Sequence, residues 1–169
     1  LGMGDSTSIW VAQLVGTEIR LIDYYENHGV GLDHYVKWIK DNDYSKAEHI
    51  LPHDVRVREL GTGKSRLEML EEAGLEIKIA PRMSLDDGIQ AVRRILPRCW
   101  FNMPKVETGL NCLRNYRRDY DEKRKIFYER PLHDWSSHGS DSFRYLALGL
   151  DEGHSTWSKP INQLPKWIV

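Results

Sequence analysis

The sequence contains no long hydrophobic run. Its 169 residues nowhere include about 18 consecutive apolar residues, so no transmembrane helix is predicted. The opening residues, LGMGDSTS, lack the basic and apolar regions of a secretory signal peptide and also lack an initiator methionine. We therefore interpret the chain as an excised domain.

Cysteine is scarce, and cysteines and histidines are not spaced as zinc ligands. The two cysteines, Cys99 and Cys112, are too few for the disulfide framework of a small secreted domain, and we expect reduced thiols. No Cys/His pattern resembles a zinc site, so we reject zinc. No serine or cysteine stands in a nucleophile-elbow motif, so acyl-transfer chemistry is unsupported.

A complete phosphate-binding loop is also missing. The stretch GTGKS at 61–65 ends like a Walker A motif, but Arg58 stands where the first glycine is required. ATP hydrolysis by this chain is therefore not expected. Lys64, together with free N–H groups at the start of a following helix, remains a candidate contact for a phosphate.

Positive charge is concentrated in the middle third of a nearly neutral chain. The formal net charge of −1 neither favours nor excludes nucleic acid as a partner. The basic residues of the middle third are Arg93, Arg94, Arg98, Arg114, Arg117, Arg118, Lys123, Arg124 and Lys125. Two interpretations stay open here: a nucleic-acid contact, or a solvated helix face interleaved with acidic residues.

Apolar patterns predict strands and helices that alternate along the chain. β-rich runs at Ser8–Leu14 and Glu18–Tyr25 predict an antiparallel hairpin. Further strands are expected at 47–51, 75–80 and 124–129, and helices at 32–42, 65–73, 84–97, 106–119 and 136–150. Residues 151–169 lack periodicity and are interpreted as a C-terminal tail, extended or disordered unless it docks through Trp157 and Trp167.

The length and the order of elements predict one α/β domain over residues 1–150. A chain of this length suits a single domain with a substantial core. Strands that alternate with helices imply a mixed sheet with helices on both faces. An antiparallel start followed by parallel strands fits a ribonuclease H-like fold, although other α/β folds share this pattern.

The segment 131–147, PLHDWSSHGSDSFRYLA, has the densest set of candidate site residues. A helix through it places four side chains on one side, namely Asp134, His138, Asp141 and Tyr145. Carboxylates fixed on one element and joined by others from distant segments form magnesium or manganese sites. The alternatives are a helix N-cap for Asp134 and a solvated helix residue for Asp141.

Two further aspartates lie where a sheet presents side chains to a ligand. Asp54 follows the strand expected at 47–51, and ligands of open α/β sheets gather beyond the carboxyl ends of strands. Asp5 precedes the first strand in a glycine-containing stretch. An ordinary turn is the alternative for both. The flanking histidines are candidate general bases or metal ligands: His53, His133 and His138.

Several long motifs resemble the C-terminal part of phage terminase large subunits. They are the stretches LPHDVRVRELGTGKSR (51–66), DGIQAVRR (87–94), LPRCWF (96–101), RRDYDEKR (117–124) and PLHDWSSHGSDSFRYL (131–146). The resemblance covers roughly residues 1–150. It implies the nuclease domain of a viral DNA-packaging motor, with a ribonuclease H-like fold. Such domains cut concatemeric double-stranded DNA with two divalent ions, Mg²⁺ or Mn²⁺, held by acidic residues.

The resemblance also implies roles for particular residues. Asp54 matches the acidic residue at the end of the family's central strand, and Asp141 matches the one on its last helix. Asp134 lies near that site and is expected to assist as a metal ligand. Asp5 matches the second acidic position of the opening motif. The family's first metal aspartate would precede Leu1, so the chain departs from the pattern at its start.

The implied partners are double-stranded DNA, an ATPase domain N-terminal to Leu1, the portal protein and the small terminase subunit, in the cytoplasm of the host cell. The residues expected to hold the DNA backbone are Lys64, Arg66, Arg93, Arg94, Arg117 and Arg118. Two other functions stay open: a packaging module that binds DNA or docks on the motor without cutting, and a related ribonuclease H-like resolvase or transposase nuclease.

Overall fold

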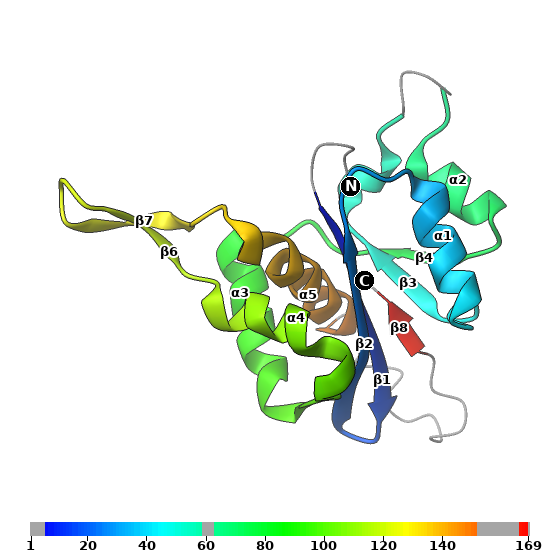
Figure 1. The fold of residues 1–169 in the computed structure, drawn as a ribbon, viewed down its shortest axis with the longest axis horizontal. Helices are drawn as coiled ribbons and strands as arrows, with labels where there is room; N and C mark the ends of the chain where they lie inside the picture. Colours follow the sequence, from blue (N-terminus) through cyan, green and yellow to red (C-terminus); the bar gives the residue numbers. More distant parts are fainter. Residues whose placement is uncertain (1–5, 59–62, 152–165, 169) are drawn as a thin grey trace.

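The computed structural model describes residues 6–58, 63–151 and 166–168 (Figure 1). The strands are β1 (Thr7–Val15), β2 (Glu18–Asn27), β3 (Glu48–Leu51), β4 (Glu76–Ile79), β5 (Cys99–Phe101), β6 (Arg118–Asp121), β7 (Ile126–Pro131) and β8 (Lys166–Ile168). The α-helices are α1 (Leu32–Asp41), α2 (Arg66–Glu72), α3 (Leu85–Ile95), α4 (Met103–Asn115) and α5 (Trp135–Asp151), with 3₁₀ turns η1 at His53–Arg56 and η2 at Leu96–Arg98. Within these residues, no helix has both the length and the apolar character needed to cross a membrane.

Six strands form one mixed sheet in the order β4-β3-β8-β1-β2-β5. The expected hairpin is confirmed: β1 pairs antiparallel with β2 through a tight turn at Gly16, whose φ of +58° suits glycine. β8 runs antiparallel to β1 and parallel to β3. Because β1 and β3 run in opposite directions, the first residues of β1 lie at the same end of the sheet as the last residues of β3.

Helices cover both faces of this sheet, as expected (Figure 1). Successive residues of β1 point to opposite faces, so Trp10 and Val11, both fully buried, belong to two different cores. Trp10 packs with α5 through Phe143, while Val11 belongs to the core that includes α1 residues such as Tyr35. Each face thus has its own hydrophobic core.

The longest helix, α5, approaches β1 closely. Trp10 Nε1 donates a 2.8 Å hydrogen bond to the Gly139 carbonyl, and Ser8 Oγ donates a 2.8 Å bond to the His138 carbonyl. A Cβ added at Gly139 would lie 2.8 Å from Cys112 of α4, so only glycine allows this approach. The first turns of α5 are therefore fixed against both β1 and α4.

The structure differs from the sequence expectations in three places. The helix expected to run to Asp119 ends at Asn115, and β6 follows, paired with β7 as a separate two-stranded sheet. The short strand β5 was not predicted, because three residues provide no periodic signal. Lys166–Ile168, within the segment interpreted as a tail, forms β8 between β1 and β3. Trp157 lies outside the described residues.

Candidate metal and phosphodiester site

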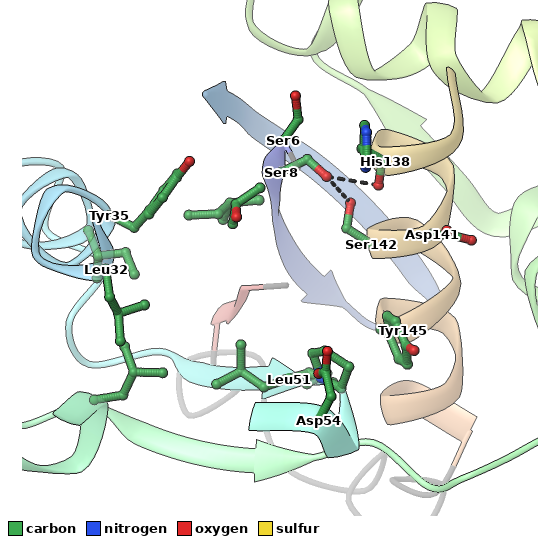
Figure 2. Close-up of a pocket in the computed structure, with 16 residues that line it drawn as sticks. Ser6, Ser8, Leu32, Tyr35, Leu51, Asp54, His138, Asp141, Ser142 and Tyr145 are labelled. Atoms are coloured by element: carbon green, nitrogen blue, oxygen red, sulfur yellow. Dashed lines mark hydrogen bonds between the residues drawn. The ribbon is translucent and has the colours of Figure 1, made fainter. Parts of the chain in front are cut away.

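A cavity of about 220 Å³ opens where β1 begins and β3 ends (Figure 2). One wall is apolar and includes Ile9, Leu32, Tyr35, Ile39, Leu51 and Leu70. Polar residues around it come from the start of β1 and the residue before it, from η1 and from α5, and include Ser6, Thr7, Ser8, Asp54, His138, Asp141 and Ser142. The cavity therefore brings together two of the aspartates singled out in the sequence.

Asp54 reaches the cavity because β3 passes through Pro52 directly into η1. The next residue, Val55, is fully buried and anchors this turn in the core. Asp54 Oδ1 is buried and has no hydrogen-bond partner among the described residues. An unpaired buried carboxylate oxygen is costly, so its persistence indicates a position suited to a cation or a donor.

Asp141 lies on α5, across the cavity from Asp54. Its side chain is 41% exposed, and Oδ1 lies 3.2 Å from Arg144 Nη2. Figure 2 shows the carboxylate turned away from Asp54, so joint coordination of an ion requires Asp141 to leave Arg144 and rotate. Burial, followed by the negative charge of Asp141, raises the pKa of Tyr116 to about 12.

Two serines fix the part of α5 that lines the cavity. Ser8 Oγ lies 2.9 Å from Ser142 Oγ and bonds to the carbonyl of His138 (Figure 2). The His138 ring lies beside this junction, with the His133 ring centroid 5.5 Å away. His138 thus lines the same cavity as Asp141, which follows it by three residues on α5.

Asp134 is not brought into this cavity. Its Oδ1 accepts hydrogen bonds from the Ser136 N–H (2.9 Å) and Ser136 Oγ (2.6 Å), and its Oδ2 lies 3.2 Å from Arg117 Nη1. The bonds from Ser136, with a smaller contribution from Arg117, hold the pKa of Asp134 below its usual value. The geometry is that of the N-cap alternative rather than of a metal ligand.

A full metal cluster is not visible in the described part of the chain, where no three His, Cys, Asp or Glu side chains converge. Asp5, the remaining metal candidate, lies outside the described residues. The residues that fit a divalent cation are Asp54, with its unpaired oxygen, and Asp141 after rotation. Carboxylate oxygens are the ligands that Mg²⁺ and Mn²⁺ prefer.

The element GTGKS does not present a free helix end to a phosphate. Ser65 N-caps α2 in a capping box, in which Glu68 accepts a 2.6 Å bond from the Ser65 N–H. Lys64 Nζ is paired with Glu72 at 2.7 Å. The groups expected to contact a phosphate, the Ser65 N–H and the Lys64 ammonium, are therefore already bonded to Glu68 and Glu72 of α2.

The other basic residues expected at DNA are distributed over three elements. Arg66 begins α2, Arg93 and Arg94 are exposed in the last turn of α3, and Arg118 is exposed on β6. Arg117 is engaged with Asp134 at the start of α5. None of them is among the residues that line the cavity.

Comparison with known proteins adds the fold family. No protein-family profile matches the sequence, and no curated protein matches it. Among solved structures, the chain is similar to the large-terminase nuclease domain of bacteriophage SPP1, solved with bound Mn (18% identity, 89% of this chain and 81% of that chain, TM-score 0.61). It is also similar to the large-terminase nuclease of the thermophilic phage G20c, solved with bound cobalt (17% identity, 85% and 81%, TM-score 0.52).

A third similar structure is the large terminase of another thermophilic bacteriophage, at 16% identity and a TM-score of 0.64. The match covers 87% of this chain but only 37% of that protein. These structures match most of the length of this chain. Its mixed sheet with helices on both faces is therefore the ribonuclease H-like fold that phage large-terminase nuclease domains have.

Proposed function

We propose that this chain is the nuclease domain of a phage DNA-packaging terminase and acts as a metal-dependent endonuclease on concatemeric double-stranded DNA. The observation that carries this proposal is the meeting of Asp54 and Asp141 at one cavity. The two residues come from distant segments: Asp54 follows the carboxyl end of β3, and Asp141 lies on α5. The bound Mn and cobalt of the two similar nucleases support a divalent cation as cofactor.

Asp54 and Asp141 would hold the metal, with Asp5 as a further candidate, and the resemblance favours two ions, Mg²⁺ or Mn²⁺. When bound, such ions would supply the activation of water and the stabilisation of the leaving oxygen in phosphodiester hydrolysis. The unpaired Oδ1 of Asp54 is ready to accept such a cation without losing a hydrogen bond. Asp141 would have to leave Arg144, which lies 3.2 Å from its Oδ1, to hold the same ion.

The chain's own polar groups complete the site. The His138 imidazole is placed beside the cavity to accept or return a proton during cleavage. Ser8 keeps that histidine and Asp141 at a fixed distance from β1, through its bonds to the His138 carbonyl and Ser142. Such fixed geometry is what positions a scissile phosphate for attack.

The proposed nuclease function implies several partners. Duplex DNA is held through its phosphates by exposed arginines such as Arg93, Arg94 and Arg118. An ATPase domain is proposed to precede Leu1, since one similar large terminase is far longer than this chain. The portal protein and the small terminase subunit are the further proposed partners, in the host cell cytoplasm.

A plasmid-nicking assay with Mn²⁺, Mg²⁺ or EDTA tests this function. We expect cutting that requires the metal, and a loss of about 100-fold or more in both Asp54→Asn and Asp141→Asn. The matched control is Asp86→Asn, an exposed carboxylate on α3, which should cut like the wild type. Full activity in both site variants would contradict the assignment.

A second candidate is a packaging module that binds DNA or docks on the motor without cutting. It is favoured by the absence of a third converging ligand in the described part of the chain. Metal-dependent nicking by the wild type would exclude this alternative. DNA binding without cutting under any metal condition would favour it.

A further inference from the structure

The β6–β7 hairpin stands clear of the rest of the domain (Figure 1). It exposes apolar side chains that a solvated ribbon does not need: Phe127 is 65%, Ile126 48% and Tyr120 39% exposed. Tyr120 and Phe127 are cross-strand partners whose ring centroids lie 4.8 Å apart. Exposed apolar groups clustered on a projecting element mark an interaction surface.

The carboxylate of Asp121, at the start of the turn of the hairpin, is hydrogen-bonded within the turn. Asp121 accepts hydrogen bonds from the backbone N–H groups of Lys123 (2.9 Å) and Arg124 (3.0 Å) and from Tyr128 Oη (2.9 Å). Lys125 adopts a left-handed φ of 55° and bonds to the Asp121 carbonyl at 2.7 Å. The Asp121 carboxylate is hydrogen-bonded within the turn, whereas the side chains of Lys123, Arg124 and Lys125 are exposed.

Basic side chains outnumber acidic ones on the hairpin, whose exposed acidic residues are Glu122 and Glu129. Residues 117–130 contain six basic and four acidic side chains. Of the acidic ones, Asp121 is bonded inside the turn and Asp119 lies 3.8 Å from Arg130. Within the described part of the chain, Arg118, Lys123 and Lys125 have no acidic partner. An aromatic surface with this charge is complementary to a polyanion rather than to a neutral protein surface.

The base of the hairpin is tied to the helix that lines the cavity. The Leu132 N–H donates a 2.9 Å bond to the Arg117 carbonyl, and the Arg117 guanidinium lies 3.2 Å from Asp134. Asp134 in turn caps α5, and His138 follows one turn later. A ligand on the hairpin is thus held next to the candidate site.

We propose that this hairpin is an arm that enters a groove of duplex DNA beside the site. A two-stranded ribbon fits the major groove of B-DNA. Tyr120 and Phe127 would contact sugars and bases, and Lys123 and Lys125 the phosphates on either side. This inference rests on the proposed nuclease function, because it takes DNA as the substrate.

The aromatic contact is tested by the anisotropy of a fluorescein-labelled duplex in EDTA, which separates binding from cutting. The variant Tyr120→Ser/Phe127→Ser should bind about tenfold more weakly than the wild type. The matched control is Trp100→Ser, another exposed aromatic (62%) on β5, which should bind normally. Equal affinity in the hairpin variant and the control would overturn the proposal.

The phosphate contacts are tested by a second variant that keeps the turn intact. Lys123→Gln/Lys125→Asn retains the hydrogen bonds of Asp121, and asparagine tolerates the left-handed φ at position 125. The slope of log affinity against log salt concentration should decrease by about 2, one unit for each lost phosphate contact. An unchanged slope, as expected for the distant control Lys40→Ala on α1, would contradict it.

The two proposals fail in different ways. If the wild type neither binds duplex nor nicks plasmid with Mn²⁺, the nuclease function itself fails. If the wild type binds and nicks while both hairpin variants behave like their controls, only the arm proposal fails.

Discussion

At the scale of single residues, the most informative group is the carboxylate of Asp54. One of its oxygens is buried without a partner, although the residue follows directly on a core strand. A buried polar atom in this state costs about 1–3 kcal/mol. Such a cost is kept where the free lone pair has a use, and the use that we propose is the binding of a cation.

The substitution Asp54→Asn should separate stability from ligand binding. We expect the wild type to melt at a higher temperature with Mn²⁺ than with EDTA, because a ligand that binds only the folded state stabilises it. Asp54→Asn should lose this shift while melting in EDTA about as high as the wild type, since Oδ1 of Asp54 makes no hydrogen bond that the variant could lose. Thermal unfolding followed by circular dichroism measures both. A Mn²⁺ shift that survives in the variant would count against Asp54 as a ligand.

Asp134 is expected to stabilise α5 rather than to hold metal. Replacing this N-cap by alanine should lower the free energy of unfolding by about 1 kcal/mol at pH 7. Asp134→Asn, which keeps a capping oxygen but loses the charge near Arg117, should lose less.

The effect should also depend on pH. The folded-state pKa of Asp134 is lowered, so its stabilisation is present above the unfolded value of about 3.9 and disappears as pH falls through the folded one. Urea unfolding at pH 7 and at acidic pH should show the difference between wild type and Asp134→Ala shrinking. An unchanged Mn²⁺ shift in this variant would exclude Asp134 from the metal site.

At the scale of elements, the position of α5 decides whether the site exists. Gly139 allows the helix to approach α4 and Tyr24 of β2, with Cys112 Sγ and Tyr24 Oη each 2.8 Å from the place of a Cβ. Trp10 bonds to the carbonyl of the same glycine. A helix that shifts here moves His138 and Asp141 away from Asp54.

Gly139→Ala should therefore destabilise the protein, although alanine favours helix. The cost of overpacking, about 1–3 kcal/mol, exceeds the gain of about 1 kcal/mol in helix propensity. Thr108→Ala, at an exposed position of α4, changes propensity alone and should stabilise by a few tenths of a kcal/mol, roughly. Urea unfolding compares the two. A Gly139→Ala protein as stable as the wild type would mean that α5 does not contact α4 as described.

At the scale of the whole molecule, the sheet depends on a strand from the far end of the chain. β8 lies between β1 and β3, the strands that lead to Ser8 and to Asp54. Lys166–Ile168 therefore connect the strand that carries Ser8 with the strand that precedes Asp54.

Deleting residues 166–169 should reduce both stability and the response to metal. The deletion leaves β1 and β3 without their shared partner, so the melting temperature and the Mn²⁺ shift should both fall. A chain lacking only Val169 is the control, and it should keep both. A deletion variant that melts and responds like this control would show that β8 is dispensable.

Particular residues show how far the sequence can predict this architecture. The alternating run of β1 and the capped helix after Ser84 have strong local signals, and both were predicted. Ser84 accepts the Asp87 N–H, as an N-cap serine does. The short strands β5, β6 and β8 have no such signal, and only their pairing partners fix them.

The sequence by itself determined the fold class, the helices and most strands, and the two aspartates on which the proposed function depends, because periodicity and motif order are local properties. Only the tertiary structure decided that Arg117 pairs with Asp134, that Asp54 and Asp141 line one cavity, and that β8 completes the sheet. These outcomes depend on which groups meet across the chain. A partner far away in sequence, rather than the residue's own pattern, decides each of them.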